Sequence, residues 1–423
     1  MKVLVVGSGG REHTLVWKLS QSPRVNKIYC APGNAGISSL AECVPIKVSD
    51  LESLRDFALA QKVDLTVVGP EAPLVAGLID IFEEAGLKVF GPNKAAAQLE
   101  GSKSFAKELM AKYGIPTGHF KTFTEPEAAK AYIRQLNTPC VVKVDGLAAG
   151  KGVVVAMKPE EALQAVDDLT ANNQEAAATL LVEEFLQGEE VTVMAFADGN
   201  AVRPMVWAQD HKRVYDGDEG PNTGGMGAYS PTGLETPELE RQIYREILVP
   251  TVKAMAQEGR PFRGILYAGL ILTREGPKVL EYNARFGDPE CQVILPRLKS
   301  DLVDIIEAVL DGKLANLDIS WSEEAAACVV MASGGYPGKY EVGYPISGLE
   351  NLPQAVVVFH AGTTHDQGQI VTGGGRVLGI TGLGATLEKA VASAYSGVDR
   401  IRFTNRHCRM DIAWRAFRRQ QIK

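Results

Sequence analysis

Cysteine is scarce in this sequence, and the spacing of the few cysteines gives them no common use. The 423 residues include six cysteines, which are scattered along the chain without a C-x-x-C pair. This spacing argues against a zinc site and against a disulfide framework. The pattern is typical of buried or incidental thiols.

Long apolar runs and an excess of positive charge are also missing. Charges or glycines interrupt every apolar run well short of the roughly 20 residues that a membrane-spanning helix needs. The run Met1–Gly7 is too short for a signal peptide and leads into a strand-turn pattern. A net charge of -7 offers no basic surface to nucleic acid. We expect a cytoplasmic protein, monomeric or a small homo-oligomer, that binds neither membrane nor nucleic acid.

A short basic stretch near the end of the sequence is the one local concentration of positive charge. It consists of Arg415, Arg418, Arg419 and Lys423. Because the stretch is small, a solvated helix face explains it better than a binding patch does.

The first hundred residues alternate short apolar strands with helical stretches. This alternation is typical of a doubly wound parallel sheet, whose ligand site lies at the carboxyl ends of the strands. Three loops are expected at that edge, at 7–12, 31–36 and 69–73. The predicted strands are 2–7, 27–30, 65–69 and 88–90, and the predicted helices include 51–61 and 74–85.

Two further regions follow the break at Gly91-Pro92-Asn93. The predicted helices are 95–113 and 237–258, and the predicted strands are 140–144, 153–156, 180–184, 190–197, 264–272 and 277–283, the last two joined by a hairpin. From about residue 325 the pattern is rich in strands and Gly or Pro turns. We predict an α/β and α+β multidomain protein with domains at 1–101, 102–324 and 325–423, and a mobile lid subdomain at about 119–187.

The first glycine loop, Gly7-Ser8-Gly9-Gly10-Arg11-Glu12, follows a strand and opens a helix. Free backbone N–H groups there can bind an anion, and Arg11 adds a cation suited to phosphate. Glu12 stands where a dinucleotide fingerprint requires its third glycine, and the second strand does not end in an acidic residue. The loop therefore favours a phosphate or ribose-phosphate site over a nicotinamide site, and a tight turn without ligand is the alternative.

A strand lysine and a glycine loop form the second motif, Val141 to Val153. Lys143 lies on the strand, and the loop carries Lys151, followed by Gly152 where a Walker loop has Ser or Thr. A lysine fixed on a strand beneath a glycine lid can still hold the phosphates of a nucleoside triphosphate. A flexible surface hairpin is the alternative.

A pair of metal ligands is predicted within Lys278 to Glu290. On a strand, Glu281 and Asn283 point to the same face, and two such oxygen donors suit Mg²⁺. Arg285 follows on that side and can grip a carboxylate. Weaker signals come from the acidic turn at Glu183-Glu184 and from Asp210-His211-Lys212 beside the glycine stretch Gly217–Gly227, which we expect to be a mobile lid. For His211 a structural and a catalytic role stay equally open.

Together these motifs resemble the ATP-grasp superfamily and, within it, the glycinamide ribonucleotide synthetase family. The resemblance covers the chain up to Asp411–Arg415, and its most specific segments are Gly220–Gly227 and Arg285–Glu290. It implies that ATP phosphorylates glycine and that the amine of 5-phosphoribosylamine attacks the glycyl phosphate. An acyl phosphate supplies the good leaving group that a carboxylate lacks, and its formation needs mainly positioning and charge neutralisation.

The resemblance also implies roles for individual residues. Asp210, Lys212 and Arg285 are expected at glycine and the transferring phosphoryl group, and Glu281 and Asn283 at Mg²⁺ or Mn²⁺. The expected ATP ligands are Lys103, Lys143, Gly146, Gly150, Lys151, Gly152, Glu183, Glu184, Phe185, Leu186 and Glu190. The expected phosphoribosylamine ligands are Gly9, Gly10, Arg11, Glu12, Asn34 and Glu71.

One segment departs from the family pattern, and three other functions compete. The segment 168–179 lacks expected glycines and looks shortened, which puts the outer contacts of the lid in doubt. A different ATP-grasp ligase, such as a carboxylase that acts on another purine intermediate, is the first competitor. A nicotinamide-binding oxidoreductase is the second, and a catalytically inactive nucleotide-binding regulator is the third.

Overall fold

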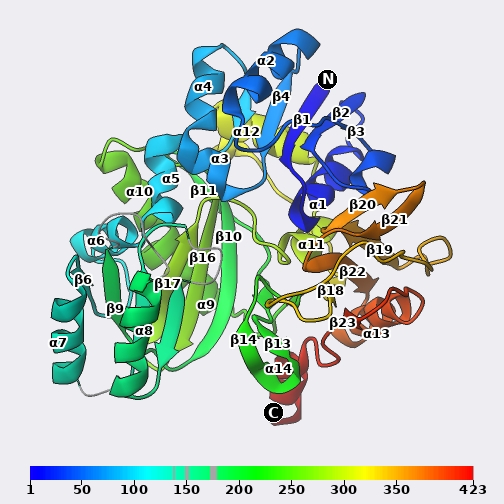
Figure 1. The fold of residues 1–423 in the computed structure, drawn as a ribbon. Helices are drawn as coiled ribbons and strands as arrows, with labels where there is room; N and C mark the ends of the chain where they lie inside the picture. The colour runs from blue at the N-terminus through cyan, green and yellow to red at the C-terminus, as the bar shows by residue number, and fades with distance from the viewer. Residues whose placement is uncertain (137–138, 148–151, 172–178, 423) are drawn as a thin grey trace.

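The computed structural model describes residues 1–136, 139–147, 152–171 and 179–422. Its elements form an N-terminal parallel sheet, two central four-stranded sheets and a C-terminal antiparallel sheet (Figure 1). No helix in the described ranges has the length and apolar character to cross a membrane. The mixed α/β and α+β architecture that the sequence predicts is confirmed.

The N-terminal sheet has the strand order β3-β2-β1-β4-β5, and every pairing is parallel. Helices lie between successive strands, so the loops after β1, β2 and β4 meet at one edge, as predicted for a doubly wound sheet. The strands are β1 Lys2–Gly7, β2 Lys27–Pro32, β3 Glu42–Cys43, β4 Leu65–Val68 and β5 Val89–Phe90. The helices are α1 Gly10–Leu19, α2 Leu51–Gln61, α3 Glu71–Ala76 and α4 Leu78–Glu84.

Two of the helices predicted from the sequence are each broken in two. The predicted helix 74–85 is wrong near its start, because Gly77 takes a left-handed φ of 101° between α3 and α4. The predicted helix 95–113 is α5, Lys94–Gly101, followed by α6, Lys103–Tyr113. Ser102 is extended there and its hydroxyl caps α6 by accepting from the N–H of Phe105. The break directs the first turn of α6 toward the central cleft.

The smaller central sheet corresponds to the predicted lid. Its order is β6-β9-β7-β8, and α7 and α8 pack against it. Its elements are β6 Phe120–Phe123, α7 Pro126–Leu136, β7 Cys140–Val144, β8 Val153–Ala156, α8 Pro159–Ala171 and β9 Leu180–Glu184. The segment 172–178, most of the region that looks shortened in the sequence, lies outside the described residues.

The larger central sheet has the order β11-β10-β16-β17, and its long strands are antiparallel. Its strands are β10 Glu189–Asp198, β11 Val202–Pro204, β16 Arg263–Thr273 and β17 Gly276–Asn283. The predicted helix 237–258 is α9 Pro237–Ile243 and α10 Val249–Gln257, joined by a π-helical turn at Tyr244–Leu248.

The C-terminal sheet includes strands from the middle of the chain. Its order is β12-β15-β18-β22-β19, with β23 on β18, so residues before 231 pair with residues after 324. Its members are β12 Gln209–Asp210, β15 Gly227–Ser230, β18 Ala325–Ser333, β19 Val356–His360, β22 Arg376–Gly384 and β23 Arg406–His407. Two hairpins, β13 Arg213–Tyr215 with β14 Glu219–Asn222 and β20 Thr363–Asp366 with β21 Gln369–Thr372, and the helices α13 Leu387–Val398 and α14 Trp414–Ile422 complete the region. The glycine stretch expected as a lid is thus partly a hairpin, and the domain boundaries stay predictions.

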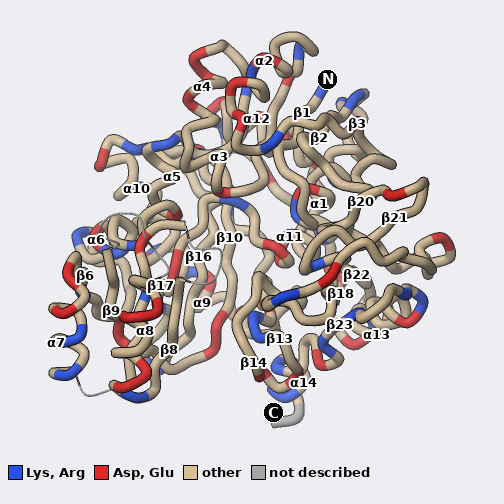
Figure 2. Tube along the Cα trace, viewed as in Figure 1, with Lys and Arg blue, Asp and Glu red and all other residues tan. Residues whose placement is uncertain are grey.

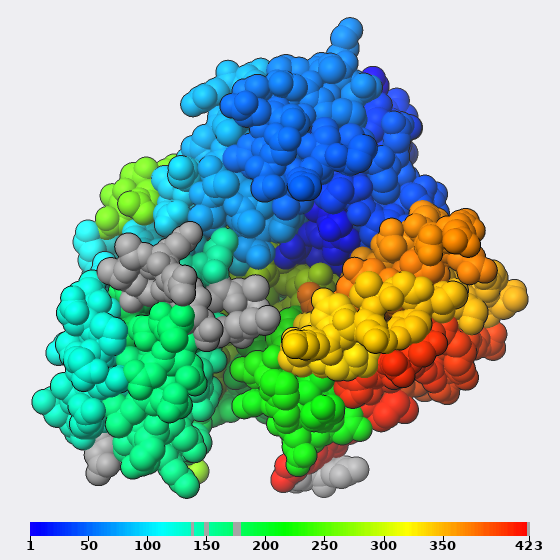
Figure 3. Space-filling view, viewed as in Figure 1, coloured from blue at the N-terminus to red at the C-terminus, as the bar shows by residue number. Residues whose placement is uncertain are grey.

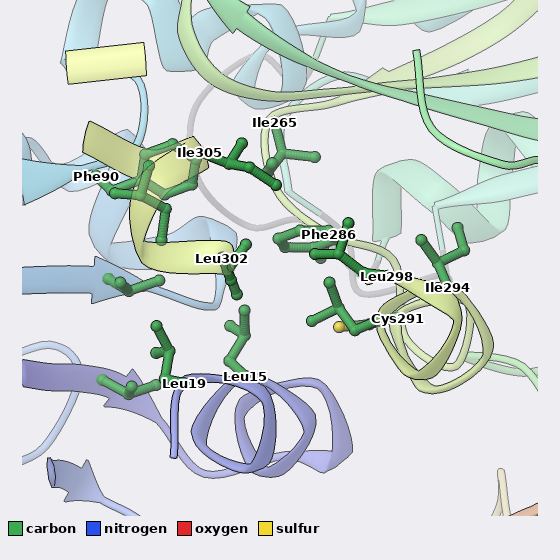
Figure 4. Packing of buried hydrophobic residues seen from close by; sticks show 14 of the residues in the cluster. Leu15, Leu19, Phe90, Ile265, Phe286, Cys291, Ile294, Leu298, Leu302 and Ile305 are labelled. Atoms are coloured by element: carbon green, nitrogen blue, oxygen red, sulfur yellow. The ribbon is translucent and has the colours of Figure 1, made fainter. Parts of the chain in front are cut away.

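One apolar core joins the N-terminal, central and C-terminal parts. Leu15 of α1 faces Leu302 of α12, Leu302–Leu310, in the close-up of Figure 4, and Ile305 of the same helix lies beside Ile265 of β16. The same cluster contains Cys291 of α11, Cys291–Ile294, and side chains of the central and C-terminal sheets. Each fully buried side chain of this size contributes roughly 1.5–3 kcal/mol. The parts that line the central cleft are therefore held together by a continuous apolar contact.

Two buried histidines lie where the N-terminal sheet meets the C-terminal sheet. The backbone N–H of His360 donates to Nδ1 of His13 at 2.8 Å, which requires a neutral acceptor nitrogen. Burial, with His360 nearby, lowers the pKa of His13 from 6.5 to about 3. Burial likewise lowers the pKa of His360 to about 4. Both rings are therefore neutral in the folded protein near neutral pH.

We predict that mild acid lowers the stability of the protein, because protonation of His13 opposes this contact. Because the folded pKa of His13 lies below the unfolded value of 6.5, its contribution is complete above about pH 6.5 and is lost as the pH falls toward 3. His13→Asn keeps an acceptor in place of Nδ1 but does not titrate. Urea unfolding of both proteins between about pH 7.5 and 5 should show a loss about 2 kcal/mol smaller in the variant. Equal losses would contradict this explanation.

Candidate active site

Three cavities meet in the cleft between the parts of the chain, where the space-filling view shows a recess (Figure 3). We call them the lysine cavity, lined by Lys103, Lys107 and Lys143, the hinge cavity, lined by Glu184, Phe185 and Leu186, and the arginine cavity, lined by Arg11, Arg285 and Arg376. Glu281 lines all three. Side chains predicted from distant motifs therefore share one continuous site.

A carboxylate shared by two lysines forms the wall of the lysine cavity. Oε2 of Glu183 lies 2.8 Å from Nζ of Lys107 and 3.0 Å from Nζ of Lys143. Burial raises the pKa of Glu183, but the two ammonium groups outweigh this effect and hold the pKa below its ordinary value. Burial lowers the pKa of Lys107 to about 8. Glu183 and Lys143 are predicted from the sequence, whereas Lys107 is not, because a lysine on a helix carries no local signal.

The second oxygen of Glu183 has no hydrogen-bond partner among the described residues. Oε1 is buried, and no described residue donates a hydrogen bond to it. An unsatisfied buried carboxylate oxygen costs free energy. Because Glu183 lines both the lysine and the hinge cavity, a donor from a bound molecule can satisfy this atom.

Lys103 enters the cleft at the start of α6. Its Nζ donates to the carbonyl of Gly146 at 2.6 Å, which ties the helix to the glycine loop. Asp145 caps the same helix by accepting from the N–H groups of Lys103 and Ser104. Gly146 and Gly152 line the lysine cavity. The predicted ATP ligands Gly150 and Lys151 lie outside the described residues.

A bulge in β17 sets the positions of the predicted metal ligands. Gly269 of β16 opposes Glu281, but the next residue, Leu270, opposes Val279, so Leu280 is an extra residue. The carbonyl of Leu280 then accepts from Nζ of Lys143 at 3.2 Å. Glu281 and Asn283 both line the lysine and arginine cavities, and none of the described residues donates a hydrogen bond to the Glu281 carboxylate. The two oxygen donors are on one face, as predicted.

The hinge cavity contains the predicted Asp210, Lys212 and Glu190. Nζ of Lys212 lies 3.1 Å from Oε2 of Glu190. Burial raises the pKa of Asp210 to about 7; Lys212 opposes this shift, whereas Glu290 and Glu190 add to it. At one end of the cavity the carboxylate of Glu184 accepts from the N–H of His119 at 3.0 Å. Phe185 and Leu186 continue the cavity wall.

His211 serves the fold. Its side chain is buried, its Nε2 accepts from the N–H of Ala413 at 3.0 Å, and burial lowers its pKa to about 4. Of the two roles left open for it by the sequence, the structure supports the structural one.

Arg285 forms ion pairs with two carboxylates of the protein in the arginine cavity. Its Nη2 lies 2.9 Å from Oε1 of Glu100, and its Nε lies 3.3 Å from Oε2 of Glu71. Nη2 also donates to Oδ1 of Asn283 at 3.2 Å, so the cation and the predicted metal ligand are linked. The sequence predicts Glu71 but misses Glu100, which lies on α5 almost 200 residues before its partner.

The first glycine loop is closed by Glu12 itself. Its Oε2 accepts from the N–H of Gly9 at 2.6 Å, and its Oε1 lies 2.6 Å from Nε of Arg11. A Cβ atom at Gly7 or Gly69 would lie 2.4 or 2.1 Å from the Glu12 side chain, so both positions need glycine. Glu12 therefore fills the loop where a dinucleotide fingerprint has open space.

The side chain of Asn34 also forms its hydrogen bonds within the protein. Its amide donates to the carbonyls of Ser8 and His360 at 2.8 and 2.9 Å, and its Oδ1 accepts from Gly36 and Ile37. Asn34 thus fixes the second loop against the first. Like Glu12, it shapes the edge of the sheet at which its sequence motif predicts a ligand.

The sequence gives no signal for Arg376, which comes from β22. Its Nη1 donates to the carbonyls of Gly224 and Asp288, both at 2.7 Å, and lies 3.3 Å from Oδ1 of Asp288. No described residue accepts a hydrogen bond from its Nε or Nη2. Arg11, in contrast, donates through Nε to Glu12 and through Nη1 to the carbonyl of Phe286. Arg376 therefore has the freer guanidinium edge of the two.

The predicted solvated face at the C-terminus is wrong for two of its arginines. Arg415 lines the hinge cavity and lies 2.7 Å from Oδ2 of Asp218. Arg419 pairs with Glu189 at the start of β10. The amphipathic pattern places cations on one face but cannot show that acidic strands lie opposite. Figure 2 shows Lys and Arg interspersed with Asp and Glu over the fold.

Comparison with known families gives three matches in succession. The N domain of phosphoribosylglycinamide synthetase matches residues 1–100, its ATP-grasp (A) domain matches 101–291 and its C domain matches 326–415. The phosphoribosylamine–glycine ligase of Halalkalibacterium halodurans is 53% identical, with 100% of this chain and 99% of that protein covered. The enzyme of the same name from Caldanaerobacter subterraneus is 52% identical, with 98% and 99% covered.

Solved structures show the same relationship. The crystal structure of phosphoribosylamine–glycine ligase from Thermotoga maritima has a TM-score of 0.85 at 34% identity, with 97% of this chain and 100% of that chain covered. The biotin carboxylase domain of 2-oxoglutarate carboxylase from Hydrogenobacter thermophilus has a TM-score of 0.74 at 18% identity, with 96% and 91% covered. The second likeness shows a shared fold.

The two carboxylates of Arg285 should differ in their effect on stability. The Glu100 side chain is 6% exposed and that of Glu71 is 31% exposed. Glu100→Gln leaves a buried cation with a weaker partner and should lower the free energy of unfolding by about 3 kcal/mol. Glu71→Gln should lower it by less than about 1 kcal/mol. Urea unfolding measures both variants, and equal losses would contradict the view that Glu100 is the main partner of Arg285.

Proposed function

We propose that this chain, which belongs to the phosphoribosylglycinamide synthetase family, ligates glycine to 5-phosphoribosylamine at the expense of ATP. The products are glycinamide ribonucleotide, ADP and phosphate, and the reaction is the second step of de novo purine synthesis. The observation that carries the proposal is the position of Glu281 on the wall of all three cavities. One carboxylate can thereby face the nucleotide, the amino acid and the amine.

The chemistry proceeds through glycyl phosphate. One oxygen of the glycine carboxylate attacks the γ-phosphorus of ATP, and ADP leaves. The amine then attacks the acyl carbon, inorganic phosphate leaves and the amine loses a proton. Phosphoryl transfer of this kind depends on positioning and charge neutralisation, which the cations of the cleft supply. No Ser or Cys nucleophile is needed.

ATP fits the hinge and lysine cavities together. The adenine would lie against Glu184, Phe185 and Leu186, and its exocyclic amine is the donor that can satisfy Oε1 of Glu183. A guanine would present a carbonyl oxygen there and be repelled. Glu190 would receive the ribose, and Lys103 and Lys143 the phosphates, beneath the loop that begins at Gly146.

Glu281 and Asn283 fit a divalent ion. They are two oxygen donors on one strand face, and Mg²⁺ usually takes one or two protein carboxylates together with phosphate oxygens and water. The described residues contain no group of three or more His, Cys, Asp and Glu side chains that could hold an ion without a nucleotide. When bound, the ion would neutralise the phosphate oxygens. Mn²⁺ would satisfy the same donors.

The two other substrates fit the remaining side of the cleft. Asp210, Lys212 and Arg285 would hold glycine and the phosphoryl group in transfer. Phosphoribosylamine would occupy the arginine cavity beside Gly9, Gly10 and Glu71, with Arg11 and the freer edge of Arg376 toward its phosphate. Glu12 and Asn34 would act by fixing the loops. We also propose that the enzyme works in the cytoplasm, as a monomer or small homo-oligomer, without nucleic acid or membrane.

The experiment is ADP formation by the purified protein with glycine, phosphoribosylamine and Mg²⁺, against mixtures that lack one component. We expect ADP only in the complete mixture, and formation that does not depend on glycine would contradict the function. Glu281→Ala should lower kcat by at least about 100-fold, because a metal ligand in the transition state is lost. Glu275→Ala is the control, since its side chain is 77% exposed on the same hairpin. Wild-type turnover by Glu281→Ala at limiting Mg²⁺ would refute the metal assignment.

A further inference from the structure

The last helix of the chain reaches the nucleotide side of the cleft. Arg415, on the first turn of α14, lines the hinge cavity, whose other lining residues lie between 141 and 281. Figure 1 shows α14 beside the β13–β14 hairpin. The family match to the C domain ends at residue 415, whereas the helix continues to Ile422.

Arg415 makes two directed contacts at the cavity wall. Its Nη1 donates to the backbone carbonyl of Asp210 at 3.1 Å, and its Nη2 donates to Oδ2 of Asp218 at 2.7 Å. The other oxygen of Asp218 lies 2.8 Å from Nη1 of Arg409, whose side chain is fully buried. The planar fork of Arg415 is therefore held in one orientation, and it fixes the backbone at Asp210.

The fixed backbone carries Lys212. Two residues after Asp210, its ammonium lies 3.1 Å from Glu190 and is also attracted by Asp210 and Glu281. Arg415 attracts Asp210 and Glu190 as well. Without Arg415, more of the neutralisation of these two carboxylates would fall to Lys212, which would be drawn toward them and away from the nucleotide phosphates. Arg419 reinforces the arrangement by pairing with Glu189 and donating to the carbonyl of Thr232.

We propose that Arg415 is a positioning residue of the ATP site, through which the C-terminal helix keeps Lys212 directed at the nucleotide phosphates. The inference rests on the proposed function for the identity of the nucleotide. It assigns a part in the ATP site to a helix that lies far along the chain from the glycine loop at Gly146.

The experiment compares Arg415→Ala with Arg418→Ala, an exposed position on the same helix. Arg415→Ala should raise KM for ATP about tenfold, because about 1.4 kcal/mol of a charge-assisted contact is lost. The thermal midpoint should stay close to the wild-type value. Arg415→Lys, which keeps the charge but not the fork, should lie between Ala and wild type. Guanidinium ion at low millimolar concentration should restore part of the ATP affinity of Arg415→Ala.

Some outcomes would overturn the inference. They are identical kinetics of Arg415→Ala and Arg418→Ala, or a defect that guanidinium leaves unchanged while the thermal midpoint falls. ATP binding to each variant, measured calorimetrically without the other substrates, separates this inference from the proposed function. Failure of the wild type to form ADP would contradict the proposed function. Equal ATP affinities of the wild type and Arg415→Ala would contradict the positioning role of Arg415.

Discussion

The site depends on pairing the buried cations of the cleft with carboxylates of the protein. Lys107 and Lys143 share Glu183, Lys212 pairs with Glu190, and Arg285 lies between Glu71 and Glu100. Without their partners, these cations would repel one another, and their desolvation would cost free energy. A triphosphate with its metal ion can compete for the same cations, because it brings both the negative charge and the acceptor oxygens. The site is thus preorganised for a highly charged ligand.

The fold holds these pairs at fixed distances by using distant parts of the chain. Lys143 and Glu183 lie on neighbouring strands of the small sheet, with Lys143 opposite Leu181 and Val141 opposite Glu183. The bulge at Leu280 brings β17 to Lys143, and strands β12 and β15 of the central segment extend the C-terminal sheet. The core around α12 binds the N-terminal sheet to the rest. Chain segments hundreds of residues apart are therefore fixed around one cleft.

Local patterns predict the longer strands of the N-terminal and central sheets and several site residues, but not the partners of those residues. Lys143 and Glu281 lie on strands as expected, because alternation and glycine loops are local signals. Glu100, Lys107 and Arg376 belong to the site through tertiary contacts, which leave no pattern in the sequence. Glu12 and Asn34 show the converse, since their motifs point to ligands and their side chains bond within the protein. The breaks at Gly77 and Ser102 depend on a single residue each and are hidden within helical periodicity.

The central claim is that these paired charges serve to move the γ-phosphoryl group of ATP onto the carboxylate of glycine. The most direct test is the fate of oxygen when glycine labelled with ¹⁸O in both carboxylate oxygens is turned over with ATP and phosphoribosylamine. If glycyl phosphate forms, one labelled oxygen is carried into each inorganic phosphate released, and mass spectrometry of the phosphate will detect it. Unlabelled phosphate from a reaction that yields glycinamide ribonucleotide would contradict the account.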